Sequence, residues 1–158
     1  MLSTIQIEQE VQTRLQEQGL HGALALLNSR TPHRFTGAYR YDGDVLRNEG
    51  LYDRFAPEGV RGDDVPMPLA YCALVGERNS GLQFADARED GRFAWKSGSA
   101  VVSYCGALMR DESGRPYGTV CHFDLLRCEP NVTELEQLEV VAPLIFRWLR
   151  ARAAGGRD

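Results

Sequence analysis

Apolar residues recur at helical spacing at both ends of the chain. Near the start, Ile7, Val11 and Leu15 follow one another at every fourth position in a segment rich in Gln and Glu, which predicts an amphipathic helix. We expect this helix to run to about residue 29 and to bend or break at Gly19, because glycine is a poor helix former. A second helix near the C-terminus is indicated by apolar residues at the same spacing, namely Leu135, Leu138, Ala142, Ile145 and Leu149.

Between these helices the pattern changes to the alternation that is typical of half-buried strands. Asp42-Gly43 is a strong hairpin signal, and Ser113-Gly114 marks a second hairpin. The segment Asp53–Pro68 is rich in Pro and Gly and is predicted to be a long surface loop, followed by a short helix over Leu69–Arg78. The predicted strands cover residues 35–41, 45–52, 82–84, 100–109 and 117–126.

Tight hairpins impose antiparallel pairing on the strands that they connect. We therefore predict an α+β fold with a single antiparallel β-sheet, flanked by N- and C-terminal helices that cover one of its faces. The 158 residues match the usual size of one domain. The predicted division is an N-terminal helical segment over residues 1–30, a domain over 31–152 that includes the C-terminal helix, and a disordered tail over 153–158.

The charge balance limits the classes of partner. A net charge of −4 and a pI near 5.4 give no general attraction to nucleic acid or to anionic membranes, because such binding needs a basic surface. The first residues lack both the cationic and the apolar segment of a secretion signal, so we expect a cytoplasmic protein.

Four cysteines lie at irregular intervals, at Cys72, Cys105, Cys121 and Cys128. In a chain of this size the spacing favours reduced thiols over a disulfide framework. No C-x-x-C or H-x-x-x-H pair is present, so we expect neither a metal site nor a bound cofactor.

Three segments in the second half of the chain carry a resemblance to a known family. Leu82–Phe93, with the sequence LQFADAREDGRF, is similar to a "strand, D-A, then D-x-R-F" segment. Tyr104–Leu108 resembles a "Y-x-G-x-P-L" strand, with alanine where proline is usual, and Gly114–Asp124 resembles "G-x-x-x-G-T-L-C-x-x-D". Together, and in this order, these segments resemble the GAF domain, a ligand-binding module of signalling proteins whose layered sheet is similar to those of PAS domains and profilin.

The resemblance implies a stand-alone sensor that binds a small molecule and acts in trans, without catalysis of its own. It also implies a homodimer formed through the terminal helices, and a possible signalling protein as partner. A ligand cavity is expected between the sheet and the irregular connections that precede the last two strands. The residues expected to bind the ligand are Tyr71, Cys72, Phe84, Asp86, Arg92, Phe93, Trp95, Tyr104 and His122.

Two alternatives stay open. Some GAF-fold proteins reduce free methionine sulfoxide through cysteines, which implies a possible thiol-dependent reductase that uses Cys72, Cys105 or Cys121. The other alternative is a pure protein-interaction domain with a collapsed cavity.

The register of the last hairpin bears on the chemistry of these thiols. Cys121 and His122 are adjacent on one strand and point to opposite faces, so they cannot pair with each other. Cys105 is expected to lie opposite either Cys121, which allows a redox pair, or His122, which allows a thiol beside an imidazole.

Overall fold

One antiparallel sheet forms the middle layer of the protein. The structure is a computed structural model and describes residues 4–90 and 99–155. The six strands are arranged in the order β3-β2-β1-β6-β5-β4, and every neighbouring pair is antiparallel. Their bounds are β1 Phe35–Asp42, β2 Val45–Asp53, β3 Val65–Pro66, β4 Leu82–Phe84, β5 Ser103–Arg110 and β6 Pro116–Asp124.

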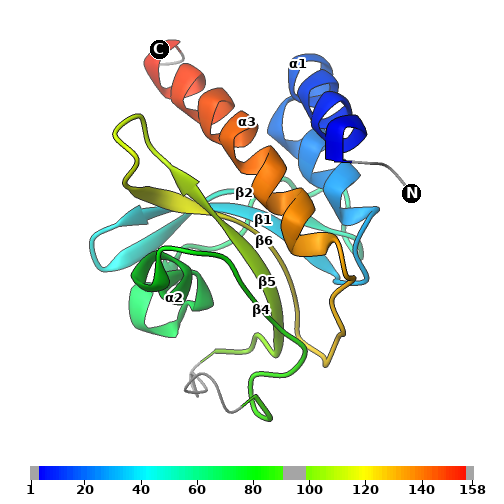
Figure 1. Cartoon of the computed structure of the whole chain (residues 1–158), viewed down its shortest axis with the longest axis vertical. Coiled ribbons are helices and arrows are strands. Elements are labelled where there is room, and N and C mark those ends of the chain that lie inside the picture. The colour runs from blue at the N-terminus through cyan, green and yellow to red at the C-terminus, as the bar shows by residue number, and fades with distance from the viewer. Residues whose placement is uncertain (1–3, 91–98, 156–158) are drawn as a thin grey trace.

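Helices cover both faces of this sheet. The long helices α1 (Thr4–Asn28) and α3 (Glu134–Gly155) pack side by side on one face, and the short helix α2 (Tyr71–Arg78) lies on the other (Figure 1). The α+β fold with one antiparallel sheet and flanking terminal helices is therefore confirmed. The predicted break in the first helix is confirmed too, because Gly19 has a non-helical backbone with φ of 75°.

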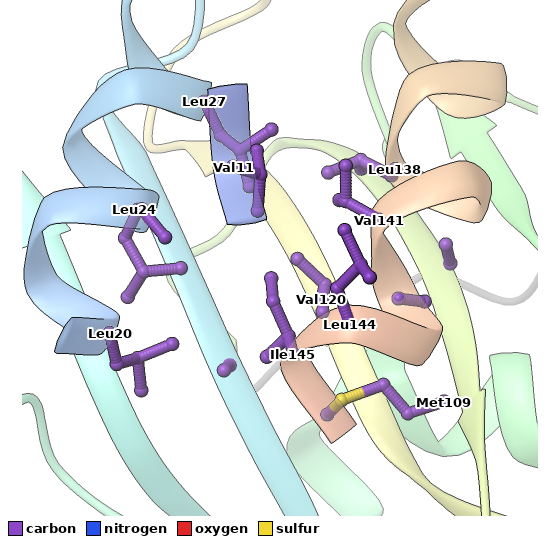
Figure 2. Close-up of a cluster of buried hydrophobic side chains, with 14 of the residues drawn as sticks. Val11, Leu20, Leu24, Leu27, Met109, Val120, Leu138, Val141, Leu144 and Ile145 are labelled. Carbon is purple, nitrogen blue, oxygen red and sulfur yellow. The ribbon is translucent and has the colours of Figure 1, made fainter. Parts of the chain in front are cut away.

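The larger core lies between the sheet and the two long helices. Val11 and Leu24 of α1 and Val141 and Ile145 of α3 are fully buried there and meet Val120 of the sheet (Figure 2). Each such side chain contributes about 1.5 to 3 kcal/mol when it is fully buried. This core fixes the position of α1 and α3 on the sheet.

A second and smaller core lies between the sheet and α2. It is richer in aromatic residues and sulfur, and it contains Tyr39, Tyr71, Cys72, Val75, Leu82, Phe84, Tyr104 and Cys121. The central strand β6 contributes to both cores, because successive side chains on a strand point to opposite faces. Val120 faces the long helices and Cys121 faces α2.

Gly118 allows β6 to pair closely with β1. A Cβ atom at this position would lie 1.8 Å from the carbonyl oxygen of Tyr39, a distance that no side chain tolerates. The "Gly-Thr" of this strand is therefore a packing requirement of the central strand pair.

Two segments differ in detail from the sequence prediction. The predicted loop Asp53–Pro68 contains the two-residue strand β3, and a turn of 3-10 helix, η1 (Met67–Leu69), precedes α2. Helix α3 continues to Gly155, beyond the predicted start of the tail at residue 153. Within residues 4–90 and 99–155, none of the helices combines the length and the apolar character that crossing a membrane requires.

Candidate functional site

A small cavity lies between α2 and the sheet. Its volume is about 90 Å³. The described residues that line it come from β1, β2, β3, β5, β6, η1, the start of α2 and the connections: Tyr39, Leu46, Val65, Leu69, Ala70, Tyr71, Cys72, Ser99, Val101, Tyr104, Cys121 and Phe123. The cavity therefore combines an aromatic and aliphatic wall with phenol and thiol groups.

Strand alternation brings these groups together. Cys121 and Phe123 on β6 and Tyr104 on β5 point to the α2 side, because each lies two residues from a neighbour on the same face. Cys72 is the second residue of α2, so its side chain meets the sheet at the helix N-terminus. The hydroxyl of Tyr41 fixes this end of α2 by donating a 2.6 Å hydrogen bond to the carbonyl oxygen of Cys72.

The sulfur of Cys72 is the centre of the polar contacts beside the cavity. The hydroxyl of Thr119 donates a hydrogen bond to Cys72 Sγ at 3.0 Å, and the hydroxyl of Tyr104 donates another at 3.1 Å. Cys121 Sγ lies 4.0 Å from the same sulfur. A sulfur that accepts hydrogen bonds from two hydroxyl groups is placed to carry negative charge.

These contacts separate the acidities of the two thiols. Burial opposes ionisation of Cys72, but the hydrogen bonds from Cys121, Thr119 and Tyr104 outweigh it and lower the pKa of this thiol. Burial raises the pKa of Cys121 well above its usual range, and the adjacent Cys72 sulfur raises it further. Of the two, Cys72 is therefore the one that ionises first, and it is the stronger candidate nucleophile.

Aromatic packing and one glycine hold Tyr104 in place. The Tyr104 ring stacks on Phe84, with ring centroids 5.9 Å apart, and Phe84 meets Tyr71 edge to face at 5.0 Å. A Cβ atom on Gly106 would lie 2.2 Å from the Tyr104 hydroxyl oxygen, so the tyrosine lies across this glycine. Phe84 thus supports the cavity from behind and is not among the residues that line it.

Asp86 has a different local role. Its carboxylate accepts hydrogen bonds from the backbone N–H of Arg88 at 2.9 Å and from the Arg88 guanidinium at 2.9 and 3.0 Å. The guanidinium holds the pKa of Asp86 at about 2. Asp86 therefore caps a turn and does not line the cavity. Arg92, Phe93 and Trp95, which were also predicted to bind ligand, lie outside the described residues.

His122 lies on the opposite face of the sheet from the cavity. Its Nδ1 atom is 2.6 Å from the hydroxyl of Thr36, which itself accepts a 2.9 Å hydrogen bond from the Asn28 amide. The placement of His122 in the cavity wall is thus incorrect, because the same alternation that points Cys121 toward α2 points His122 toward the long helices. Tyr71, Cys72 and Tyr104 are the predicted residues that the structure brings together around the cavity.

In the β5–β6 hairpin, Cys105 lies opposite His122 and not opposite Cys121. This pairing does not activate the thiol. Cys105 Sγ donates to the Gln83 side chain at 3.8 Å, and burial together with the charge of Glu134 raises its pKa. Cys105 therefore remains a neutral thiol on the face of the sheet that α1 and α3 cover.

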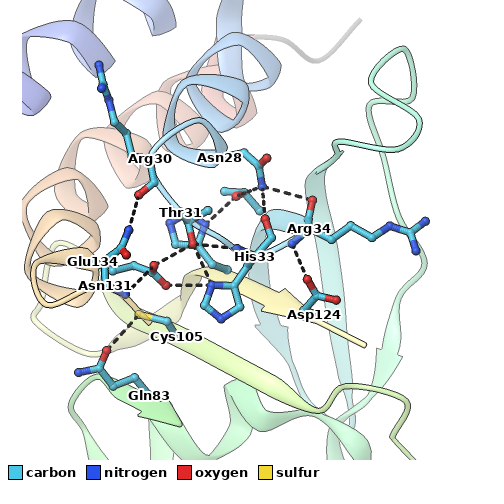
Figure 3. Close-up of polar contacts among 12 residues, drawn as sticks. Asn28, Arg30, Thr31, His33, Arg34, Gln83, Cys105, Asp124, Asn131 and Glu134 are labelled. Carbon is cyan, nitrogen blue, oxygen red and sulfur yellow. Dashed lines mark hydrogen bonds and ion pairs between the residues drawn. The ribbon is translucent and has the colours of Figure 1, made fainter. Parts of the chain in front are cut away.

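Sequence reasoning did not predict a buried polar network around Glu134, at the start of α3. Glu134 accepts a 2.8 Å hydrogen bond from the Thr31 hydroxyl and lies 3.0 Å from His33 Nδ1 (Figure 3). The His33 and His122 rings are stacked, with centroids 6.1 Å apart. Residues more than 80 positions apart in the sequence meet here, so no local sequence pattern predicts the network. It ties the ends of α1 and α3 to β1 and β6.

The comparisons with known proteins give the fold. No protein-family model matches the sequence, and no curated protein sequence does. The GAF domain of the Acinetobacter phosphoenolpyruvate-protein phosphotransferase superimposes with a TM-score of 0.72 at 13% identity, over 99% of each chain. The corresponding GAF domain from Coxiella burnetii gives 0.71 at 13% identity, over 97% of this chain and 96% of that one. The chain has the GAF fold.

A GAF-fold enzyme is similar to a comparable degree. The free methionine-R-sulfoxide reductase from Neisseria meningitidis, solved with its substrate, has a TM-score of 0.70 at 14% identity, over 96% of this chain and 91% of that one. At these identities the likeness shows the fold alone. The cavity between α2 and the GAF sheet must therefore be interpreted from its own residues.

Because His122 is buried and neutral, we expect the folded protein to lose stability in mild acid. The folded protein holds the imidazole neutral down to about pH 3, because burial lowers its pKa from 6.5. Between the folded-state pKa of about 3 and the unfolded-state pKa of 6.5, protons bind preferentially to the unfolded chain, so the free energy of unfolding falls as the pH drops. We expect the free energy of unfolding to fall by roughly 2 kcal/mol between about pH 7.5 and 5 through this group.

Urea denaturation at the two pH values measures this difference. His122→Asn, which keeps a polar partner for Thr36 but does not titrate, should reduce the pH-dependent loss. His21→Asn removes a histidine outside the network and is the matched control. A loss of the same size in wild type and His122→Asn would contradict the assignment.

Proposed function

We propose that this GAF domain is a sensory module that binds a small molecule of a few non-hydrogen atoms in the cavity between α2 and the sheet. The observation that supports this most directly is the convergence of Tyr71, Tyr104, Cys72 and Cys121 on one cavity from three different elements. Ligand sites typically combine an apolar wall with a few polar groups that fix orientation.

The size of the cavity restricts the ligand. A volume of about 90 Å³ corresponds to a few water molecules, since one water occupies roughly 30 Å³ in the liquid. Cavities for drug-sized ligands usually measure about 300 to 1,000 Å³. The proposed ligand is therefore much smaller than a nucleotide or a tetrapyrrole.

The central strand offers a route from the cavity to the long helices. Cys121 lines the cavity, whereas its neighbours Val120 and His122 contact the core and the polar network beneath α1 and α3. A ligand that displaces β6 therefore changes the packing of both terminal helices. In this proposal those helices carry the signal in trans, and two copies of the chain pair through them.

Ligand binding can be tested with small probes and a variant that fills the cavity. We expect dimethyl sulfoxide, imidazole or acetamide to shift the backbone amide signals of Ala70, Tyr71 and Cys72 in two-dimensional NMR spectra. Leu69→Trp should weaken this response at least about tenfold, because Leu69 lines the cavity and an indole would occupy it.

Leu74→Trp is the matched control, since Leu74 lies on α2 and is also partly buried but does not line the cavity. Native mass spectrometry of protein purified from cells would show whether a small molecule copurifies. No response to any probe, together with an unliganded mass, would contradict the proposal.

A thiol-dependent reductase is the second candidate. The observation in its favour is the Cys72 sulfur, which accepts two hydroxyl hydrogen bonds and lies 4.0 Å from Cys121. The Neisseria meningitidis protein with the same fold acts on free methionine-R-sulfoxide. A whole amino acid is larger than the cavity in this chain, which favours the sensor.

The sensor and the reductase differ in whether the protein turns over free methionine sulfoxide. The sensor proposal predicts that wild-type protein with dithiothreitol reduces free methionine sulfoxide no faster than dithiothreitol alone, as followed by chromatography of the methionine formed. Turnover that disappears in Cys72→Ser or Cys121→Ser and persists in Cys105→Ser would establish the reductase in place of the sensor.

A further inference from the structure

We propose that Cys72 and Cys121 form a redox-active thiol pair that a small hydroperoxide oxidises to a disulfide in the cavity wall. This inference rests on the proposed function in one respect, namely that the cavity admits a small polar molecule. It goes further in naming a class of reactant and the two atoms that react.

The geometry of the two sulfurs supports the pairing. Their 4.0 Å separation must shrink by about 2 Å to form a disulfide bond. Cys121 is held in the central strand, whereas Cys72 lies in the first turn of an eight-residue helix that has a 3-10 turn before it and a left-handed residue, Asn79, after it. In this proposal, side-chain rotation and a small displacement of α2 close the gap.

The surroundings assign different roles to the two thiols. Cys72 accepts hydrogen bonds from Thr119 and Tyr104, and it lies at a helix N-terminus, where negative charge is favoured. Cys121 is fully buried beside it, and burial keeps its proton in place. Cys72 is thus the thiol that attacks, and Cys121 is the thiol that resolves the intermediate.

The reaction balances with one hydroperoxide. The Cys72 thiolate attacks the terminal oxygen of ROOH, the O–O bond breaks, and the alkoxide leaves as ROH after taking the proton released by Cys72. Cys121 then attacks the sulfur of the Cys72 sulfenic acid, the S–O bond breaks, and the leaving hydroxide takes the Cys121 proton to form water. Two thiols lose two electrons, and the peroxide gains them. An external dithiol such as dithiothreitol reverses the change.

The cavity suits such an oxidant. Hydrogen peroxide is about the size of two waters and fits a volume of about 90 Å³, and both sulfurs line that volume. The other cysteines are placed differently, since Cys105 lies on the opposite face of the sheet and donates to Gln83, and Cys128 is partly exposed and does not line the cavity.

Disulfide formation would change the cavity itself. It removes the thiolate that accepts the hydrogen bonds from the Thr119 and Tyr104 hydroxyls, and it draws the start of α2 toward β6. Tyr71 and Leu69 lie at this end of the helix and line the cavity, so its shape depends on the oxidation state. The pair therefore couples the redox state of the protein to ligand binding.

Peptide mapping after oxidation tests the proposal on the full chain. Wild-type protein is treated with hydrogen peroxide, its remaining thiols are alkylated under denaturing conditions, and the digest is analysed by mass spectrometry. We expect a linked peptide that joins Cys72 to Cys121, and its loss after dithiothreitol. Cys121→Ser should accumulate a Cys72 sulfenic acid that dimedone traps, whereas Cys105→Ser should form the same disulfide as wild type.

Titration of wild-type protein in oxidised and reduced dithiothreitol mixtures, with peptide mapping at each ratio, follows the pair without any substitution. Four free thiols after peroxide treatment, or a disulfide that involves Cys105 or Cys128, would overturn the inference. A protein that binds dimethyl sulfoxide but forms no disulfide contradicts this inference alone. One that forms the disulfide but binds none of the small probes contradicts the proposed function alone.

Discussion

Strand β6 lies between two different chemical environments, and the alternation of its side chains determines what each side of the molecule can do. Val120 and His122 belong to the core beneath the long helices, whereas Thr119 and Cys121 belong to the sulfur-rich side beneath α2. Gly118 makes this arrangement possible, because only a residue without a side chain allows β1 and β6 to approach so closely. Both environments therefore meet at a single strand.

The hydrogen bonds at Cys72 determine the character of the cavity. A thiol that is buried among aromatic rings would ordinarily be inert, because burial opposes its ionisation. Here two hydroxyl donors and the first turn of α2 act against burial, and hydrogen bonds to a charged group are worth about 1.5 to 3 kcal/mol each. The same hydroxyls position the sulfur beside Cys121, so acidity and geometry have a common origin.

Local signals predicted the fold well. The spacing of Ile7, Val11 and Leu15, the Asp42-Gly43 turn and the alternation of β6 each depend on neighbouring residues, and the structure confirms the elements that they indicated. The registers of the strands were harder to predict. Cys105 pairs with His122 because the turn that Asp111 stabilises, together with an irregularity at Arg110, shifts the pairing by one residue.

The site was only partly predictable. The resemblance led us to expect Tyr71, Cys72 and Tyr104 at the cavity, and they line it, but the contacts of Thr119 and Cys121 with α2 span almost 50 residues of sequence. His122 was misplaced although the alternation that excludes it from the cavity was already visible beside Cys121. The network of His33 and Glu134 joins residues from opposite ends of the chain, which no periodic pattern reveals.

The most direct test of this account is the acidity of Cys72 in the intact protein. The rate at which iodoacetamide alkylates Cys72, followed by peptide mass spectrometry as a function of pH, gives the pKa of this thiol. We expect a pKa below that of an unperturbed cysteine thiol, because hydroxyl hydrogen bonds favour the thiolate, and an increase in Thr119→Val, which removes one hydroxyl donor. A Cys72 pKa that is not lowered and does not change in Thr119→Val would contradict this expectation.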